Sequence, residues 1–321
     1  MILRNALLAI LMLLLILFPS VLFNSTYEEN SAEVRGWFAF LNRPTVAIGR
    51  LRAKRWFKPV AFGLFFLLGA LIYAFLSPGF GFHRSSLALF LGLLTGLVAV
   101  TLVAEVPVIL YVRKRHGEEG QIRLLAGSLI VAVVCVAVSR LVHFQPGYLY
   151  GIIAGASFSA AVKDDEQGRG LAVGSAILLA VSIAAWLLWI PVKDAANQPG
   201  AGLPILVLDA VLVAIFVTGV EAVVIGLMPL RFLDGHKVFR WHRVWWAILF
   251  VVGAFALVHM LLRPGGGYFQ TSKNTPLYTM LALFVVFGVV SVAFWAYFAF
   301  RKPRGGEPEA QAATADPAPG A

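Results

Sequence analysis

The chain contains a succession of apolar runs, each long enough to cross a lipid bilayer as an α-helix. A helix needs about 20 mostly apolar residues to span the hydrocarbon core. The first run, LLAILMLLLILFPSVLF, carries no charged residue. Of all residues, 60% are hydrophobic and 13% are charged, whereas a soluble domain is about half apolar and a quarter charged. These features predict an integral membrane protein.

We predict an all-α fold, a polytopic transmembrane helical bundle of about nine spans that occupies residues 1–300. The predicted spans are residues 4–23, 59–77, 87–112, 124–144, 147–162, 171–191, 205–228, 244–262 and 277–300. The first span is expected to remain uncleaved, because no small-x-small cleavage site follows it. Residues 301–321, rich in Ala, Pro, Gly and Glu, are expected to form a disordered cytoplasmic tail.

The distribution of basic residues predicts the orientation of the bundle. Loops with an excess of Lys and Arg lie on the cytoplasmic side of a membrane. With nine spans, most of the 26 Lys and Arg residues fall on one side, including those of 24–58, 113–123 and 229–243. Without a crossing at 147–162, the last two of these loops would face opposite sides. We therefore expect the N-terminus outside and the C-terminus inside, in the cytoplasmic (inner) membrane.

The span at 147–162 is short and rich in small residues. Gly147, Gly151, Gly155 and Ser159 recur every four residues and would line one face of a helix. Small residues allow neighbouring helices to approach closely in lipid. We expect this helix to pack in the centre of the bundle.

Two segments combine aromatic and basic residues, which is typical of the lipid headgroup region. The first, residues 34–58, is too polar to cross the membrane and includes Arg50, Arg52, Lys54, Arg55 and Trp56. The second includes Arg240, Trp241 and Arg243, with Trp245 and Trp246 close behind. The expected partners are anionic lipid headgroups and a membrane or cytoplasmic protein. No nucleic-acid-binding module accompanies these segments, so nucleic acid is not expected.

Four charged residues fall inside predicted spans, where each costs about 2.5–3.5 kcal/mol on insertion scales. Arg140 and Asp209 lie near the outer ends of their spans and can pair, with His143 one turn from Arg140. Glu105 and Glu221 lie at one depth near the inner side, where two carboxylates can share a proton or bind a cation. The alternative for each set is a structural ion pair or hydrogen bond between helices.

The segment GLMPLRFLDG, residues 226–235, places an acid directly after a span. On a structural interpretation, Pro229 ends the span and Asp234 caps the next helix. The segment also resembles the Asp motif of site-2 intramembrane metalloproteases, in which the Asp binds a metal ion. That family needs His-Glu-x-x-His as well, and none of the six His residues forms this pattern. We expect no metal site, no cofactor and no catalytic residue.

A second resemblance covers more of the chain. IGLMPLRFLDG, residues 225–235, is similar to the signature of actinobacterial FGLLP-motif membrane proteins, and SRLVHFQPGYLYG, residues 139–151, is similar to a second block of theirs. That family has no assigned function. The resemblance implies a bacterial multi-pass protein. It also implies that these two blocks are important for the protein, although it supplies no reaction.

Three functions remain open on this sequence. The favoured one is a non-enzymatic scaffold, assembly factor or regulatory subunit, because the chain shows no complete catalytic set. The alternative is a proton- or ion-coupled transporter that uses the intramembrane carboxylates. The third is an inactive protein similar to site-2 proteases that still binds transmembrane helices of client proteins.

Overall fold

The structure is a computed structural model of the 321-residue chain. It describes residues 2–30, 33, 34, 36, 57–77, 79–117, 121–124, 129, 132, 133, 136, 137, 154–157, 164–230, 233–261 and 275–300. The interfacial segment at 34–58 and the tail at 301–321 lie almost entirely outside these residues. Predictions for Arg50, Arg52, Lys54, Arg55 and Trp56 therefore stay predictions.

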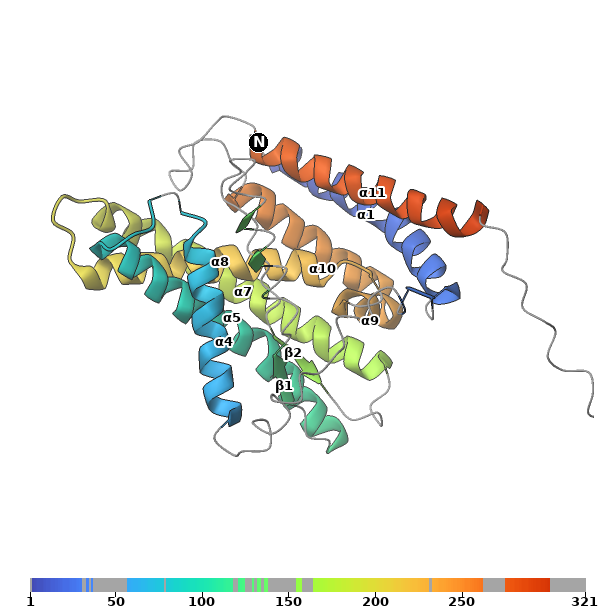
Figure 1. Ribbon diagram of the computed structural model, residues 1–321, viewed down its shortest axis with the longest axis horizontal. Coiled ribbons are helices and arrows are strands. Elements are labelled where there is room, and N and C mark those ends of the chain that lie inside the picture. Colours follow the sequence, from blue (N-terminus) through green and yellow to red (C-terminus); the bar gives the residue numbers. More distant parts are fainter. Residues whose placement is uncertain are drawn as a thin grey trace, which may run out of the picture.

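Helices make up almost all of the described chain (Figure 1). They are α1 (Ile2–Glu29), α4 (Phe57–Ala74), α5 (Arg84–His116), α7 (Asp164–Ala196), α8 (Leu203–Gly226), α9 (Asp234–Trp241), α10 (Arg243–Ala256), the π-helical turn η2 (Leu257–Leu261) and α11 (Thr275–Phe300). Helices thus cover the predicted spans outside 124–162. The prediction of nine spans stays a prediction, because 124–162 lies mostly outside the described residues.

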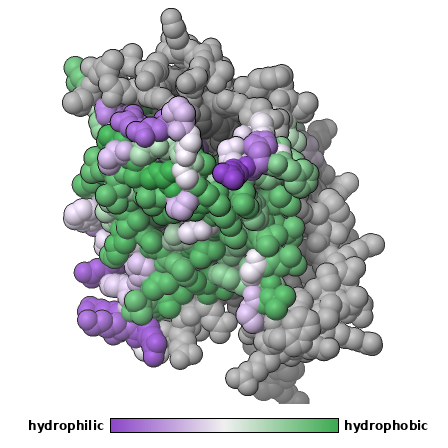
Figure 2. Space-filling view, turned by 90° about the vertical axis from the view of Figure 1, so that its left-hand side faces the viewer, coloured by the Kyte–Doolittle hydropathy of each residue, from purple (hydrophilic) through white to green (hydrophobic). Residues whose placement is uncertain are grey.

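Five of the described helices are long and apolar enough to cross a membrane: α1, α5, α7, α8, and α10 together with η2. Their outward faces are apolar as well. Leu14 is 60% exposed, Leu188 is 61% exposed and Val289 on α11 is 64% exposed. On the face shown in Figure 2, apolar side chains form a continuous surface and hydrophilic side chains gather toward its margins. Such a surface fits lipid rather than water, and the chain is a multi-pass membrane protein.

The centre of the bundle is built from α5, α7 and α8, which pack closely at glycines. A Cβ at Gly92 or Gly96 would collide with Ala210 or Ala214, so α5 and α8 run parallel with their backbones close together. On α7, a Cβ at Gly174 would lie 2.7 Å from the Ala104 carbonyl oxygen of α5. These contacts occur because small residues let helix backbones approach closely in lipid.

The remaining helices define two ends of the bundle. Asn5 on α1 hydrogen-bonds His259 of η2 at 3.1 Å, and Asn24 near the other end of α1 bonds Pro229, just after α8. α11 lies beside α1 and runs parallel to it, with the rings of Phe23 and Phe294 5.0 Å apart (Figure 1). We call the end where α5 and α8 finish and α9 lies the α9 end, and the other the opposite end.

A two-stranded antiparallel sheet replaces part of the short span predicted at 147–162. β2 (Ala154–Ser157) pairs with β1 (Gln121–Leu124) in the register Gln121↔Ser157 to Leu124↔Ala154. The helical prediction is wrong for these four residues, and Gly155 lies in a strand. Glycine is the weakest helix former after proline, and strand pairing satisfies the same backbone groups. Gly147, Gly151 and Ser159 lie outside the described residues.

The glycine contacts of α5 generate a first prediction. Gly92→Ala should lower the stability of the purified protein by about 1–3 kcal/mol, because the new methyl group must displace the backbone of Ala210. Gly63→Ala on α4 is the matched control, since nothing lies within 4 Å of a Cβ there. It should be neutral or stabilise by about 0.5–1 kcal/mol. Thermal unfolding in detergent measures both, and equal unfolding midpoints would contradict the packing described here.

Candidate functional site

The segment after α8 is held in place by side chains from distant parts of the chain. α8 ends at Gly226, and Pro229 lacks the N–H that a continuing helix would use. The Asn24 side-chain amide donates to the Pro229 carbonyl oxygen at 2.6 Å, and the Trp246 indole N–H donates to the Leu227 carbonyl oxygen at 2.7 Å. Both bonds are buried, so the end of α8 is fixed between α1 and α10.

Gly235 fixes the start of α9 against the same backbone. A Cβ at Gly235 would collide with the backbone of Leu227 and Met228. Any other residue would push α9 away from the end of α8. The Leu-Asp-Gly sequence therefore has a packing reason for its glycine.

Asp234 does not cap α9, contrary to the structural interpretation of the sequence. Asp234 is the first residue of α9, and Leu233 is the N-cap, with no side-chain hydrogen bond. Trp246 was expected at the interface but is buried, because its indole N–H bonds Leu227. Trp245 is 54% exposed, as an interfacial residue would be.

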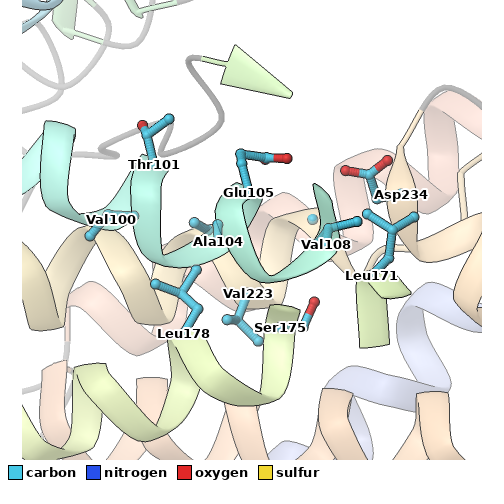
Figure 3. Close-up of a pocket in the computed structure, with 12 residues that line it drawn as sticks. Val100, Thr101, Ala104, Glu105, Val108, Leu171, Ser175, Leu178, Val223 and Asp234 are labelled. Atoms are coloured by element: carbon cyan, nitrogen blue, oxygen red, sulfur yellow. The ribbon is translucent and has the colours of Figure 1, made fainter. Parts of the chain in front are cut away.

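Asp234 instead faces a small cavity at the α9 end of the bundle. The cavity has a volume of about 60 Å³, which is room for a few water molecules. Its lining residues come from the four helices α5, α7, α8 and α9: Val100, Thr101, Ala104, Glu105, Val108, Leu171, Ser175, Leu178, Ala222, Val223, Gly226 and Asp234. Figure 3 shows the carboxyl groups of Glu105 and Asp234 turned toward each other.

Two hydroxyl groups share this cavity with the two acids. Thr101 lies one helical turn before Glu105 on α5, and Ser175 lies on α7. Sequence reasoning missed both residues. The i, i+4 spacing of Thr101 and Glu105 places them on one helix face and was the signal available for Thr101. The lining of the cavity thus combines apolar residues with oxygen-bearing side chains from three helices.

Glu221 and Asp209, the other described acids of the predicted spans, do not line this cavity. Glu221 is buried in α8 but does not line the cavity that Glu105 shares with Asp234. Asp209, at the opposite end, accepts a hydrogen bond from the Trp189 indole at 2.8 Å. Arg140 and His143 lie outside the described residues, so their expected pairing with Asp209 stays a prediction.

Burial and a neighbouring charge act in opposite directions on the Asp234 carboxyl. Burial raises the pKa of the Asp234 carboxyl above its ordinary range, and the nearby Lys237 ammonium acts in the opposite direction. Lys237 in turn donates a hydrogen bond to the Gln167 side chain of α7 at 2.8 Å. An acid of this kind exchanges its proton closer to neutral pH than an exposed aspartate does.

In the described part of the chain, no three His, Cys, Asp or Glu side chains are grouped so that they could hold a metal ion. No family model, curated protein or solved structure matches the chain. The chain is therefore assigned to no family. Its resemblances to FGLLP-motif proteins and to site-2 proteases rest only on the short blocks quoted above.

The raised pKa of Asp234 generates a second prediction, on stability and pH. The folded protein holds this proton more tightly than the unfolded chain, so its stability falls as pH rises from about 3.9 through the raised value. Asp234→Asn, which imitates the protonated acid, should remove this fall. Each unit by which the pKa is raised corresponds to about 1.4 kcal/mol. Thermal unfolding of both proteins between about pH 4 and pH 8 measures this pH dependence of stability. Parallel stability profiles for the wild type and the variant would contradict the prediction.

Proposed function

We propose that this multi-pass membrane protein conducts protons across the membrane and takes up each proton at the α9 end through Glu105 and Asp234. One observation carries the proposal. Two carboxylates that lie far apart in the sequence line one water-sized cavity, together with the hydroxyls of Thr101 and Ser175.

The chemistry of the cavity suits a proton. A buried carboxylate is far less costly in a membrane when it is protonated. Two carboxylates that share a site disfavour joint ionisation, so one of them holds a proton more strongly. Hydroxyl groups and a few waters can pass that proton along hydrogen bonds. The end of α8 at Gly226 adds carbonyl groups, whose partial negative charge favours a positive species.

We further propose that the α9 end faces the cytoplasm, with the N-terminus outside and the chain in the cytoplasmic membrane. Basic residues support this orientation, since they are more frequent at the α9 end than at the opposite end within the described helices. Those at the α9 end are Arg113, Lys114, Arg115, Arg169, Lys237, Arg240 and Arg243, and those at the opposite end are Arg4, Arg84 and Lys193. The parallel first and last helices fit an odd number of spans, such as nine.

The third prediction tests proton uptake. In liposomes of the purified protein, a potassium diffusion potential should drive proton entry that an enclosed pH dye records. Glu105→Gln and Asp234→Asn should each lower the rate at least about tenfold, because neither amide can release a proton. Asp194→Asn, an exposed acid at the opposite end, is the control and should keep the wild-type rate. The absence of wild-type flux, or wild-type rates in both cavity variants, would refute the proposal.

A second candidate function is a scaffold, assembly or regulatory subunit, which the outer pair of helices favours. α11 packs chiefly on α1, and an apolar groove of about 500 Å³ runs between them. Its lining residues include Pro19 of α1 and Val285, Gly288, Val289 and Val292 of α11. Small residues at a groove admit another transmembrane helix, so the fitting partner is a membrane protein.

The fourth prediction concerns this groove. Gly288→Leu should fill it and release any membrane protein that copurifies in mild detergent. The control, Val290→Leu, changes an exposed residue of α11 that does not line the groove. Quantitative mass spectrometry of the purified samples measures the partner. A partner retained equally by both variants would exclude the groove as its binding site.

A further inference from the structure

The Lys237 side chain of α9 is held in place by a residue of α7. Its ammonium donates a hydrogen bond to the Gln167 side-chain oxygen at 2.8 Å, and this bond is partly buried. A lysine carries its charge on a flexible four-carbon stem. The bond to Gln167 therefore fixes the position of a positive charge that would otherwise move freely.

A close approach of the two helices places Gln167 within reach of Lys237. A Cβ at Gly168 of α7 would collide with the Lys237 carbonyl group and with the Cβ of Trp241 on α9. The two helices can pack this closely only because position 168 has no side chain. Gln167 is the next residue along α7 and bonds Lys237 at the same contact. Backbone packing thus sets the register in which this hydrogen bond forms.

The bond lies at the margin of the cavity that contains Glu105 and Asp234. On α7, Gln167 precedes Leu171 by about one helical turn and Ser175 by about two, so the three residues share one helix face. Leu171 and Ser175 line the cavity. On α9, Lys237 follows Asp234 by three residues, which is about 4.5 Å along the helix axis. The ammonium that Gln167 holds is therefore a near neighbour of the Asp234 carboxyl.

Other charged or titratable groups surround Asp234 as well. Glu105 of α5 shares the cavity with it, and the guanidinium of Arg243 lies 5.4 Å from the centre of the Phe239 ring. The others in the described part of this end are Glu28 and Glu29 of α1, Arg113, Lys114 and Arg115 of α5, Glu166 and Arg169 of α7, Glu221 of α8, His236 and Arg240 of α9, and His242 just before α10. Burial raises the pKa of the Asp234 carboxyl, and the Lys237 ammonium is the charge that lowers it.

We propose that Gln167 is a positioning residue for proton conduction, which holds the Lys237 ammonium beside the cavity so that Asp234 gives up its proton at a lower pH. The inference rests on the proposed proton uptake through Glu105 and Asp234. Conduction requires a site that binds its ion well enough to fill and weakly enough to empty. Burial and a second carboxylate favour the bound proton, whereas a fixed positive charge favours the ionised acid and hence release.

The fifth prediction tests this positioning by infrared titration of the purified full chain in detergent. The carboxyl band that disappears in Asp234→Asn identifies the protonated acid. Lys237→Gln should raise the pH at which half of Asp234 is ionised by about one pH unit, because the opposite charge is removed. Gln167→Leu should raise that pH by a smaller amount, because the lysine remains but is no longer held. Lys237→Arg, which keeps the charge, should restore a titration close to that of the wild type.

The matched control is Lys114→Gln, which removes an exposed positive charge of α5 at the same end of the bundle. It should leave the titration of Asp234 unchanged. Two results would overturn the role of Lys237: an unchanged titration in Lys237→Gln, or equal shifts in Lys237→Gln and Lys114→Gln. A wild-type titration in Gln167→Leu would overturn the role of Gln167.

The same variants in liposomes separate this inference from proton conduction itself. As the pH on the uptake side is lowered, proton flux through Lys237→Gln should reach half its maximum at a higher pH than flux through the wild type. Wild-type flux without any change of titration in the variants would refute only the roles of Gln167 and Lys237. A shifted titration in a protein that shows no flux would instead refute proton conduction and leave the effect of Lys237 on Asp234 established.

Discussion

The end of α8 depends on one constraint, which is that backbone groups inside a membrane protein find no water to bond. Pro229 prevents α8 from continuing, and this leaves carbonyl groups inside the bundle. Asn24 and Trp246 supply the missing donors from α1 and α10. These two bonds connect three helices at one point, and α9 begins against the same backbone through Gly235. The position of Asp234 follows from that arrangement.

Close backbone packing then explains why a cavity exists beside Asp234. Gly174 brings α7 against Ala104 of α5, so the three central helices meet with little space between their axes. At the level of Glu105 the neighbouring lining residues are short, among them Ala104, Ser175 and Ala222. Short side chains between closely packed helices leave a water-sized space that cannot collapse further. The Glu105 side chain reaches this space from α5, and the Asp234 side chain reaches it from α9.

The sequence predicted the helices well because hydrophobicity is a local property, and most described helix ends lie within a few residues of the predicted ones. It predicted the candidate site less well. The depth of Glu105 was readable from its place in the span, but the rotation of the helix about its axis was not. Glu105 was therefore paired with Glu221, whereas the cavity places it with Asp234. Trp246 and Ala154–Ser157 differ from their sequence predictions because hydrogen bonds to distant parts of the chain hold them in place.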